Sequence, residues 1–263
     1  MSAKKQGYIF CVANQKGGVG KTTTTINLAA ALSALKKKVL LIDLDPQGNA
    51  TMGSGIDKNS EELSIYQVLI GANTIAECKQ RSESGGYDVL GANRELSGAE
   101  IDLVQMEKRE QQLKQALIHC QADYDFILID CPPTLSLLTL NGLAAAHGVI
   151  IPMQCEYFAL EGLSDLVNTI KRVYRNINDD LELIGLLRVM FDRRITLQRQ
   201  VSEQIEEHFG DKVFNTKIPR NVRLAEAPSH GMPGVVYDKN STGAKAYMEF
   251  GRELIKRLKK KTK

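Results

Sequence analysis

The chain has 263 residues, of which 43% are hydrophobic and 25% are charged. This composition is typical of a folded globular protein and excludes a largely disordered chain. The 34 basic residues exceed the 31 acidic residues by three, so the molecule as a whole is not a polycation. Six basic residues lie among the last eight positions, and without them the chain would carry −3. Any surface for an anionic partner is therefore expected to be local.

The five cysteines show no CxxC pair and no Cys/His cluster, so we expect neither a zinc site nor an iron–sulfur site. An odd number of scattered cysteines fits free thiols in a reducing cytosol. The stretch from Cys131 to Cys155 has no charged residue, but prolines and glycines interrupt it. We therefore expect a buried loop, a helix and a buried strand there, and not a membrane-spanning helix.

Short apolar runs predict seven strands, in chain order at residues 8–13, 39–42, 87–90, 126–129, 149–151, 183–189 and 213–218. Helical periodicity predicts helices at residues 21–35, 107–121, 136–146, 160–176, 196–208 and 241–259. Continuous apolar strands that alternate with helices indicate a mostly parallel sheet covered on both faces. We expect a single α/β domain over residues 1–263, built as a doubly wound sheet.

A glycine-rich segment directly follows the first predicted strand and opens the first predicted helix. It reads Lys16-Gly17-Gly18-Val19-Gly20-Lys21-Thr22-Thr23. Glycines let the backbone wrap closely round a phosphate, and the helix N-terminus adds a partial positive charge. In such a phosphate loop we expect Lys21 to reach the β- and γ-phosphates and the Thr22 hydroxyl to ligate Mg²⁺.

The loop departs from the usual phosphate-loop pattern at its start. That pattern has glycine at position 15, where this chain has Gln15, followed by a second lysine, Lys16. Such a lysine can fold back onto its own nucleotide or reach a nucleotide on a second subunit. In the second arrangement it would stabilise the transferring phosphoryl group as an arginine finger does, and hydrolysis would depend on dimerisation.

Carboxylates follow two of the predicted strands. Asp43 and Asp45 come after the second strand, and Asp130 follows the fourth. Ligands of an open parallel sheet bind at the carboxyl ends of its strands. Asp130 resembles a Walker B aspartate that holds Mg²⁺, and a carboxylate after the second strand can position or activate the attacking water.

These motifs resemble one family. The chain is similar to the ParA/Soj-type chromosome and plasmid partitioning ATPases, within the wider deviant Walker A group that includes MinD. The resemblance extends over nearly the whole chain and is carried by five segments: Asn14 to Thr22, Asp43 to Thr51, Asp130 to Pro133, Pro152 to Gly162 and Ile218 to Gly231. The last segment is typical of the partitioning branch and not of MinD.

The resemblance implies a P-loop NTPase fold, with ATP and Mg²⁺ as cofactors. It implies that residues 16–23 bind the nucleotide, with Lys16 crossing between the subunits of an ATP-bound sandwich dimer. Asp45 matches the family's hydrolysis aspartate and Asp43 lies near the metal. Thr22 and Asp130 hold the metal, and the residues expected to line the adenine are Pro219 and Asn221.

The resemblance also implies partners. The protein would be a weak ATPase that acts as a molecular switch, and its ATP-bound homodimer would bind double-stranded DNA without sequence preference. A ParB-type centromere-binding protein would stimulate hydrolysis and release the dimer from DNA. The expected location is cytoplasmic and nucleoid-associated, with no stable membrane association.

Non-specific DNA binding requires lysines and arginines that neutralise phosphates. Residues 188–200 hold four arginines and one acid, namely Arg188, Arg193, Arg194, Arg199 and Asp192. By resemblance, Arg194 and Arg223 match the family's DNA-contacting arginines, and we expect Arg193 and Arg220 in the same patch. The basic C-terminal tail is expected to add to it. Which of these arginines contact DNA stays open.

Two other functions use the same loop. The predicted C-terminal helix has an apolar stripe, formed by Tyr247, Phe250, Leu254 and Leu258. A lysine-rich end lies beside this stripe. Such a helix can lie on an anionic bilayer, as in a MinD-like membrane-associated positioning ATPase. We favour the alternative, that this stripe packs on the sheet. A metabolic enzyme that phosphorylates a small substrate is the second rival, but we find no substrate-pocket motif.

Overall fold

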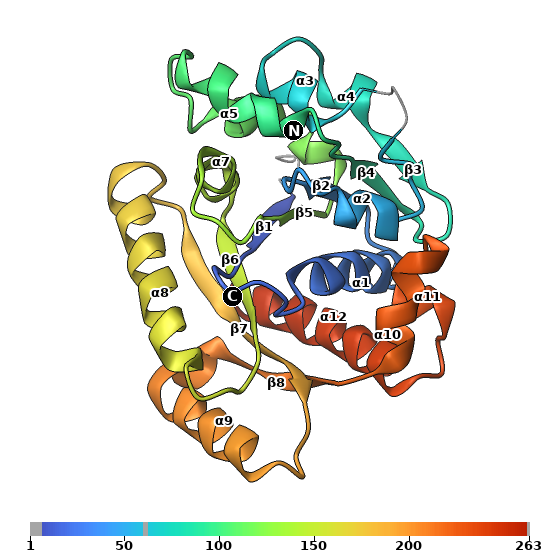
Figure 1. Cartoon of the computed structure of the whole chain (residues 1–263), viewed down its shortest axis with the longest axis vertical. Coiled ribbons are helices and arrows are strands. Elements are labelled where there is room, and N and C mark those ends of the chain that lie inside the picture. The colour runs from blue at the N-terminus through green and yellow to red at the C-terminus, as the bar shows by residue number, and fades with distance from the viewer. Residues whose placement is uncertain (1–6, 60–62, 262–263) are drawn as a thin grey trace.

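The computed structural model describes residues 7–59 and 63–261 of the chain. Within them, eight strands form one sheet in the order β3-β4-β2-β5-β1-β6-β7-β8 (Figure 1). Neighbouring strands are parallel except β3 and β4, which pair antiparallel at one edge. The strands are β1 (Tyr8–Val12), β2 (Val39–Asp43), β3 (Gln80–Ser82), β4 (Tyr87–Leu90), β5 (Phe126–Asp130), β6 (Gly148–Met153), β7 (Glu182–Phe191) and β8 (Val213–Pro219).

Helices cover both faces of the sheet. On one face lie α1 (Lys21–Ala34), α2 (Asn49–Gly53), α10 (Val222–Glu226), α11 (Gly234–Tyr237) and α12 (Thr242–Lys261). On the other lie α3 (Ile65–Leu69), α4 (Ile75–Cys78), α5 (Leu96–Val104), α6 (Gln112–Leu117), α7 (Leu137–Ala145), α8 (Ala159–Asn176) and α9 (Thr196–Phe209). Single 3-10 turns lie at Gln121–Asp123, Gly210–Lys212 and Ala227–His230. This arrangement confirms the predicted doubly wound α/β fold.

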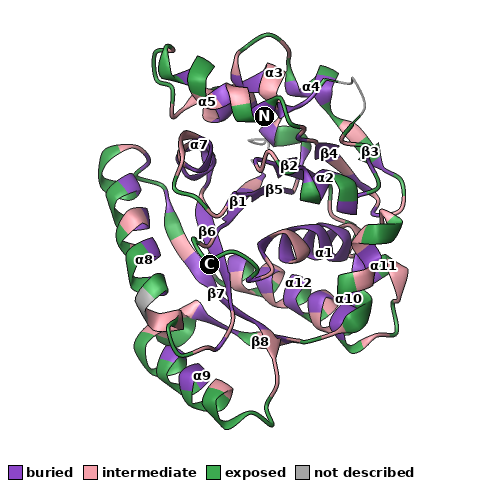
Figure 2. Cartoon of the chain, viewed as in Figure 1, coloured by how far each residue is buried: buried purple, intermediate pink, exposed green. Residues whose placement is uncertain are grey.

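The strands read as apolar runs because both of their faces are buried. In β1, Phe10 packs into the core beneath α1 and α12, whereas Ile9 and Cys11 pack into the core beneath α7 and α8. Figure 2 shows buried residues along the central strands and α1, while α8 and α9 expose one side. A parallel sheet covered on both sides produces this near-continuous burial.

Most of the elements that sequence reasoning missed are short, and the longest of them is α5 with nine residues. Strand β3 has three residues, Gln80–Ser82, and pairs only with β4 at the sheet edge, where it needs no apolar run. The predicted helix at residues 107–121 is wrong in extent, because α6 covers only Gln112–Leu117. Helices α2, α3, α4, α10 and α11 have four or five residues each, too few for a periodic pattern to show.

The uncharged stretch from Cys131 to Cys155 forms a loop, helix α7 and strand β6, as predicted. In the part of the chain that the structure describes, no helix combines the length and apolar character needed to cross a membrane.

The sheet topology brings the predicted carboxylates together. In the parallel register, Val12 of β1 lies opposite Asp130 of β5, and Asp43 of β2 lies opposite Asp130 on its other side. The carboxyl ends of β1, β2 and β5 therefore meet at one edge of the sheet. The first helix, α1, starts beside this edge, because its preceding loop continues directly from β1.

Candidate functional site

The phosphate loop is held open by its glycines and tied down by side chains at either end. Gly18 and Gly20 have φ of +72° and +75°, a conformation that favours glycine. At Gly18 no protein atom lies within 4 Å of where a Cβ would stand, so the loop borders open space. The Asn14 side chain accepts from the Lys16 backbone at 3.0 Å, and the Gln154 side chain donates to the Gly18 carbonyl at 3.1 Å.

The Lys21 side chain lies beneath this loop and is only 7% exposed. Its ammonium donates to the Lys16 carbonyl at 3.1 Å. Burial lowers the pKa of Lys21, and the charges of Asp130 and Asp45 oppose that shift. A lysine has three donors, so within the described residues two remain for an anion in the loop.

Asp130 is fully buried at the end of β5 and is bound by two hydroxyls of α1. The Thr22 hydroxyl donates to its Oδ2 at 2.7 Å and the Thr25 hydroxyl donates to its Oδ1 at 2.9 Å. Burial, with the neighbouring charge of Asp43, raises the pKa of Asp130 to about 8, although both hydroxyls lower it. A cation at this position would stabilise the ionised carboxylate.

The two aspartates at the end of β2 differ in their burial and in their hydrogen bonds. Asp43 is fully buried and accepts from the Asp45 amide at 3.1 Å, the Thr51 amide at 2.9 Å and the Thr51 hydroxyl at 2.8 Å. Burial raises the pKa of Asp43 to about 6, and the bonds from Thr51 lower it. Asp45 is half-buried in the loop that Asp43 holds, and its carboxylate accepts from the Gln47 amide at 3.0 Å.

The donor set at this edge fits a magnesium ion bound together with phosphates. Thr22 and Asp130 offer a hydroxyl and a carboxylate 2.7 Å apart, and Mg²⁺ prefers oxygen ligands. No cluster of three or more His, Cys, Asp or Glu side chains that could hold a metal occurs among the described residues. Mg²⁺ at nucleotide sites takes one or two protein ligands and completes its shell with phosphates and water, so the two observations agree.

Lys16 points outward from the loop and lies on the surface. Its ammonium pairs with Glu156 at 2.5 Å, and the two side chains are 55% and 46% exposed. The next two residues, Tyr157 and Phe158, are 75% and 71% exposed and stack edge to face. Two large exposed aromatic side chains beside an exposed lysine are a surface suited to contact with another chain.

The residues predicted to line an adenine lie at the end of β8 and just after it. Because β8 is parallel to β7, its end lies at the carboxyl edge of the sheet, where the phosphate loop also lies. Pro219 lies opposite Phe191 in the register with β7. One residue earlier in β7, Met190 lies 3.9 Å from where a Cβ of Gly20 would stand. Asn221 caps α10 by accepting from the Leu224 amide at 3.2 Å. The structure thus brings Pro219 to the loop's side of the sheet and gives Asn221 a local structural contact.

The predicted DNA-contacting arginines are exposed at the carboxyl ends of β7 and β8. Arg194 forms a fork with Asp192, with a closest distance of 2.7 Å, and these hydrogen bonds lower the pKa of Asp192 to about 2. Arg223 pairs with Glu226 at 2.9 Å. In the described part of the chain, Arg193 and Arg220 have no ion-pair partner. All four side chains are therefore exposed to solvent.

Arg188, in contrast, is not part of this surface, although the sequence groups it with the other arginines. It is 2% exposed inside the sheet and donates to the Ser202 hydroxyl at 2.8 Å, to the Glu206 carboxylate and to the Phe214 carbonyl. Its Nε has no partner among the described residues. Arg188 lies in the stretch of β7, residues 184–189, that is buried on both faces, so it joins α9 to β8 and cannot contact DNA.

Comparisons with known proteins identify the family. The model of a family described as AAA domain matches residues 7–183. Soj of Bacillus subtilis, the sporulation initiation inhibitor protein, is 49% identical over 94% of this chain and 98% of its own length. The chromosome partitioning protein ParA of Myxococcus xanthus is also 49% identical, over 95% of this chain and 89% of its own. The chain belongs to the ParA/Soj family of chromosome-partitioning ATPases.

A solved structure supports the fold of this ParA/Soj-family chain. A Mycobacterium smegmatis protein named cobyrinic acid a,c-diamide synthase, crystallised with ADP and magnesium, is 39% identical. It covers 96% of both chains with a TM-score of 0.84. Together, the comparisons confirm the family predicted from the motifs. They also confirm the prediction that the protein is an ATP-hydrolysing enzyme.

The C-terminal helix of this family member packs on the sheet, as predicted. Tyr247, Phe250, Leu254 and Leu258 are at most 6% exposed and lie in the core shared with α1. The apolar face that a bilayer would need is therefore occupied. In the basic tail, the Lys261 side chain and residues 262–263 lie outside what the structure describes.

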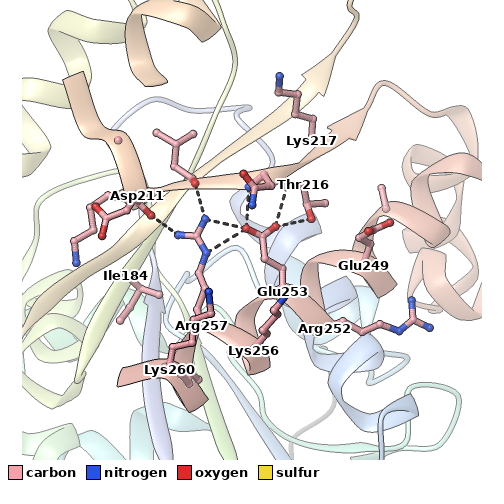
Figure 3. Close-up of a pocket in the computed structure, with 16 residues that line it drawn as sticks. Ile184, Asp211, Thr216, Lys217, Glu249, Arg252, Glu253, Lys256, Arg257 and Lys260 are labelled. Carbon is pink, nitrogen blue, oxygen red and sulfur yellow. Dashed lines mark hydrogen bonds and ion pairs between the residues drawn. The ribbon is translucent and has the colours of Figure 1, made fainter. Parts of the chain in front are cut away.

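A groove of about 940 Å³ lies between α12 and β8, and no residue of the phosphate loop lines it (Figure 3). Glu253 accepts from the amides of Asn215 and Thr216 at 2.8 and 2.9 Å. Arg257 pairs with Glu253 and donates to the Val213 carbonyl at 2.5 Å. These charges hold the irregular edge strand β8, so the network has a structural role.

Sequence reasoning missed three residues that shape the site. Thr25 follows Thr22 by three positions on α1, and this spacing places both hydroxyls on one side of the helix. The spacing could therefore have indicated that Thr25 also contacts Asp130. Glu156 and Gln154 follow β6, and nothing local in the sequence links them to a loop 140 or 136 positions away.

Proposed function

We propose that this ParA/Soj-family ATPase is a DNA-segregation switch that binds ATP with Mg²⁺ in its phosphate loop. The observation that carries the proposal is the meeting of buried Lys21, the Thr22–Asp130 pair and the open glycine loop at one sheet edge. The ADP and magnesium named for the Mycobacterium smegmatis structure support it. We treat residues 1–263 as one ATPase domain that works in the cytoplasm on the nucleoid.

In this proposal each residue of the loop has a defined part. The amides of Gly17, Gly18, Val19 and Gly20 cradle the phosphates, with Lys21 on the β- and γ-phosphates and Thr22 and Thr23 at the helix start. Thr22 and Asp130 hold Mg²⁺, and Asp43 supports the metal region through the loop that it binds. The metal ion neutralises charge on the phosphates. Asp45 orients the attacking water, and the end of β8, with Pro219 and Asn221, lines the adenine.

The ATP state is proposed to be a sandwich homodimer in which Lys16 crosses to the nucleotide of the partner. The Lys16 side chain is 55% exposed, and its ammonium forms a surface ion pair with Glu156. Exposed pairs of this kind contribute about 0–1 kcal/mol, so a phosphate of the partner can displace Glu156 readily. The neighbouring aromatic residues Tyr157 and Phe158 add apolar area to such an interface.

Dimer formation is proposed to switch on binding to double-stranded DNA. Each subunit contributes the exposed arginines at positions 193, 194, 220 and 223. The logarithm of DNA affinity falls with the logarithm of salt concentration, with a slope of about −0.9 for each neutralised phosphate. A dimer that neutralises twice as many phosphates therefore doubles this slope. A ParB-type partner then stimulates hydrolysis and releases the dimer.

The test measures binding to random-sequence duplex DNA with ATP, with ADP and without nucleotide, in the wild type and in Asp45→Ala. The variant should hold the ATP state because it lacks the carboxylate that orients water. Binding only with ATP, lost steeply as salt rises, is the expected result. Matched salt titrations of Arg194→Glu should show a smaller slope.

Two results would redirect the proposal. Binding of the ATP state to anionic liposomes and not to DNA would favour the MinD-like membrane function. Turnover that depends on a small-molecule acid and is indifferent to DNA would favour a metabolic enzyme, the class to which the name of the Mycobacterium smegmatis structure belongs.

A further inference from the structure

Met190, the second-last residue of β7, has a strained backbone. Its φ is +51°, in a region that residues with a Cβ rarely adopt. The strain falls where the pairing of β7 with β8 shifts register, between Arg188 and Phe191. Of the described residues other than glycine, only Lys36 and Lys108 share a positive φ, and both lie in exposed turns. Such strain persists where the surroundings fix it, and it clusters at ligand-binding and switch segments.

The contact that fixes Met190 comes from Gln154, the residue just after β6. Strands β6 and β7 are parallel neighbours, so both residues lie at the carboxyl edge of the sheet (Figure 1). The Gln154 side-chain nitrogen donates to the Met190 sulfur at 3.2 Å and to the Gly18 carbonyl at 3.1 Å. An amide nitrogen carries two N–H groups, so it can serve both acceptors at once. Gln154 thus joins the strained residue of β7 to the phosphate loop.

The bond from Gln154 also orients a peptide group of the phosphate loop. The Gly18 carbonyl and the Val19 N–H belong to one planar peptide, and no peptide bond in the described chain is cis. In a trans peptide these two groups point in opposite directions. Because Gln154 holds the carbonyl, it fixes the direction of the Val19 N–H before any phosphate binds. Phosphate loops bind their ligand through such N–H groups.

Two residues beyond Met190 begins a turn that carries two arginines, residues 192–195, which we refer to as the arginine turn. The Asp192 amide donates to the Gln198 side chain at 2.7 Å. The Asp192 carboxylate accepts from the Arg194 backbone at 3.0 Å and pairs with its guanidinium. A change in the backbone at Met190 therefore moves Asp192 and, with it, the Arg194 side chain.

We propose that Gln154 is a positioning residue of the phosphate loop, and that through Met190 it transmits nucleotide occupancy to the arginine turn of the same subunit. The inference rests on the proposed function, but it needs no dimer. A phosphate on the Val19 N–H holds the peptide plane in place and so favours the bond from Gln154 to the Gly18 carbonyl. Coupling between two binding sites is reciprocal, so DNA on the arginine turn raises the affinity of the loop for nucleotide.

Equilibrium binding of ATP with Mg²⁺ tests the positioning role. Gln154→Ala removes both bonds, and Gln154→Glu keeps the size of the side chain but presents only acceptors to the Gly18 carbonyl. Gln112→Ala is the matched control, because the Gln112 side chain donates to the Glu107 carbonyl at 2.8 Å, outside the loop. We expect the dissociation constant to rise about 3- to 10-fold in Gln154→Ala, at least as much in Gln154→Glu, and less than about 2-fold in the control.

Hydrogen exchange at the arginine turn tests the link through Met190, with saturating ADP and Mg²⁺ and without DNA. Met190→Leu keeps the volume and removes the sulfur acceptor, a change that folded proteins tolerate. Nucleotide should slow exchange of the Asp192 and Ile195 amides about 5-fold or more in the wild type. The slowing should fall below about 2-fold in Gln154→Ala and Met190→Leu and stay at the wild-type level in Gln112→Ala. The double variant should match the single variants, because both break one contact.

The outcomes separate this inference from the proposed function. Equal ATP affinity of Gln154→Ala and wild type would overturn the positioning role. Equal slowing of exchange in wild type, Gln154→Ala and Met190→Leu, or no slowing in the wild type, would overturn the link to the arginine turn. A wild type that binds no nucleotide would overturn the proposed function and this inference together. Urea unfolding of each variant verifies that it is folded.

Discussion

Arg188 and Arg193 lie five positions apart in the same arginine-rich segment, and the structure predicts opposite consequences for their loss. Arg188→Ala removes a side chain that is 2% exposed and bonded to α9 and β8. Arg193→Ala removes an exposed side chain at the end of β7. Both variants lose one positive charge, so net charge cannot explain a difference between them.

The expected loss for Arg188→Ala comes from two sources. Truncating a large core side chain to alanine costs about 3–5 kcal/mol through lost packing and the remaining cavity. The Phe214 carbonyl also loses a donor, while the half-exposed Glu206 stays solvated and near Lys217 at 3.5 Å. We therefore expect a loss of about 3–5 kcal/mol, which lowers the thermal midpoint by roughly 10 °C in a domain of this size.

Urea unfolding followed by far-ultraviolet circular dichroism measures these changes. Arg188→Met keeps most of the volume without the hydrogen bonds, so its loss should be intermediate. Arg193→Ala should unfold with the wild type but bind DNA more weakly in the ATP state. Equal unfolding midpoints for Arg188→Ala and Arg193→Ala would refute the reasoning, as would a stable Arg188→Ala that binds DNA as poorly as Arg193→Ala.

Three further predictions follow from the site. Lys16→Ala should bind ATP but stay monomeric in sedimentation velocity, and an ATP-dependent dimer of this variant would contradict the crossing role. Arg223→Glu should dimerise normally while losing DNA binding in a filter assay, and loss of the dimer would mark the residue as structural. Burial raises the pKa of Glu253, but bonds from Thr216, Asn215 and Arg257 outweigh it and lower that pKa. Its ionised form thus stabilises the fold above its ordinary pKa of 4.5, and the contribution is lost as pH falls through the lowered value. Glu253→Gln should therefore be less stable than wild type at pH 7, and the gap should close in acid melts; a gap independent of pH would count against this.

The fold class and the phosphate loop could be predicted because their determinants are local. Apolar runs of five residues next to helical patterns indicate a parallel sheet without reference to any distant residue. Gly18 and Gly20 of the loop have positive φ, which is a property of each residue and its neighbours. Short elements such as β3 could not be predicted, because three polar residues at a sheet edge show no hydrophobic pattern.

The sequence alone determined that a phosphate loop, three strand-end aspartates and an arginine segment exist in this chain. Only the tertiary structure decided which of them meet and which are buried. Thr22 contacts Asp130 across 108 positions and Lys16 contacts Glu156 across 140. Both contacts depend on the order in which the strands pair. Arg188 is buried because it lies in the part of β7 that helices cover on both faces, whereas Arg193 lies beyond the end of the strand and is exposed. The covering of the sheet therefore decides the exposure of each arginine, and the residue type does not.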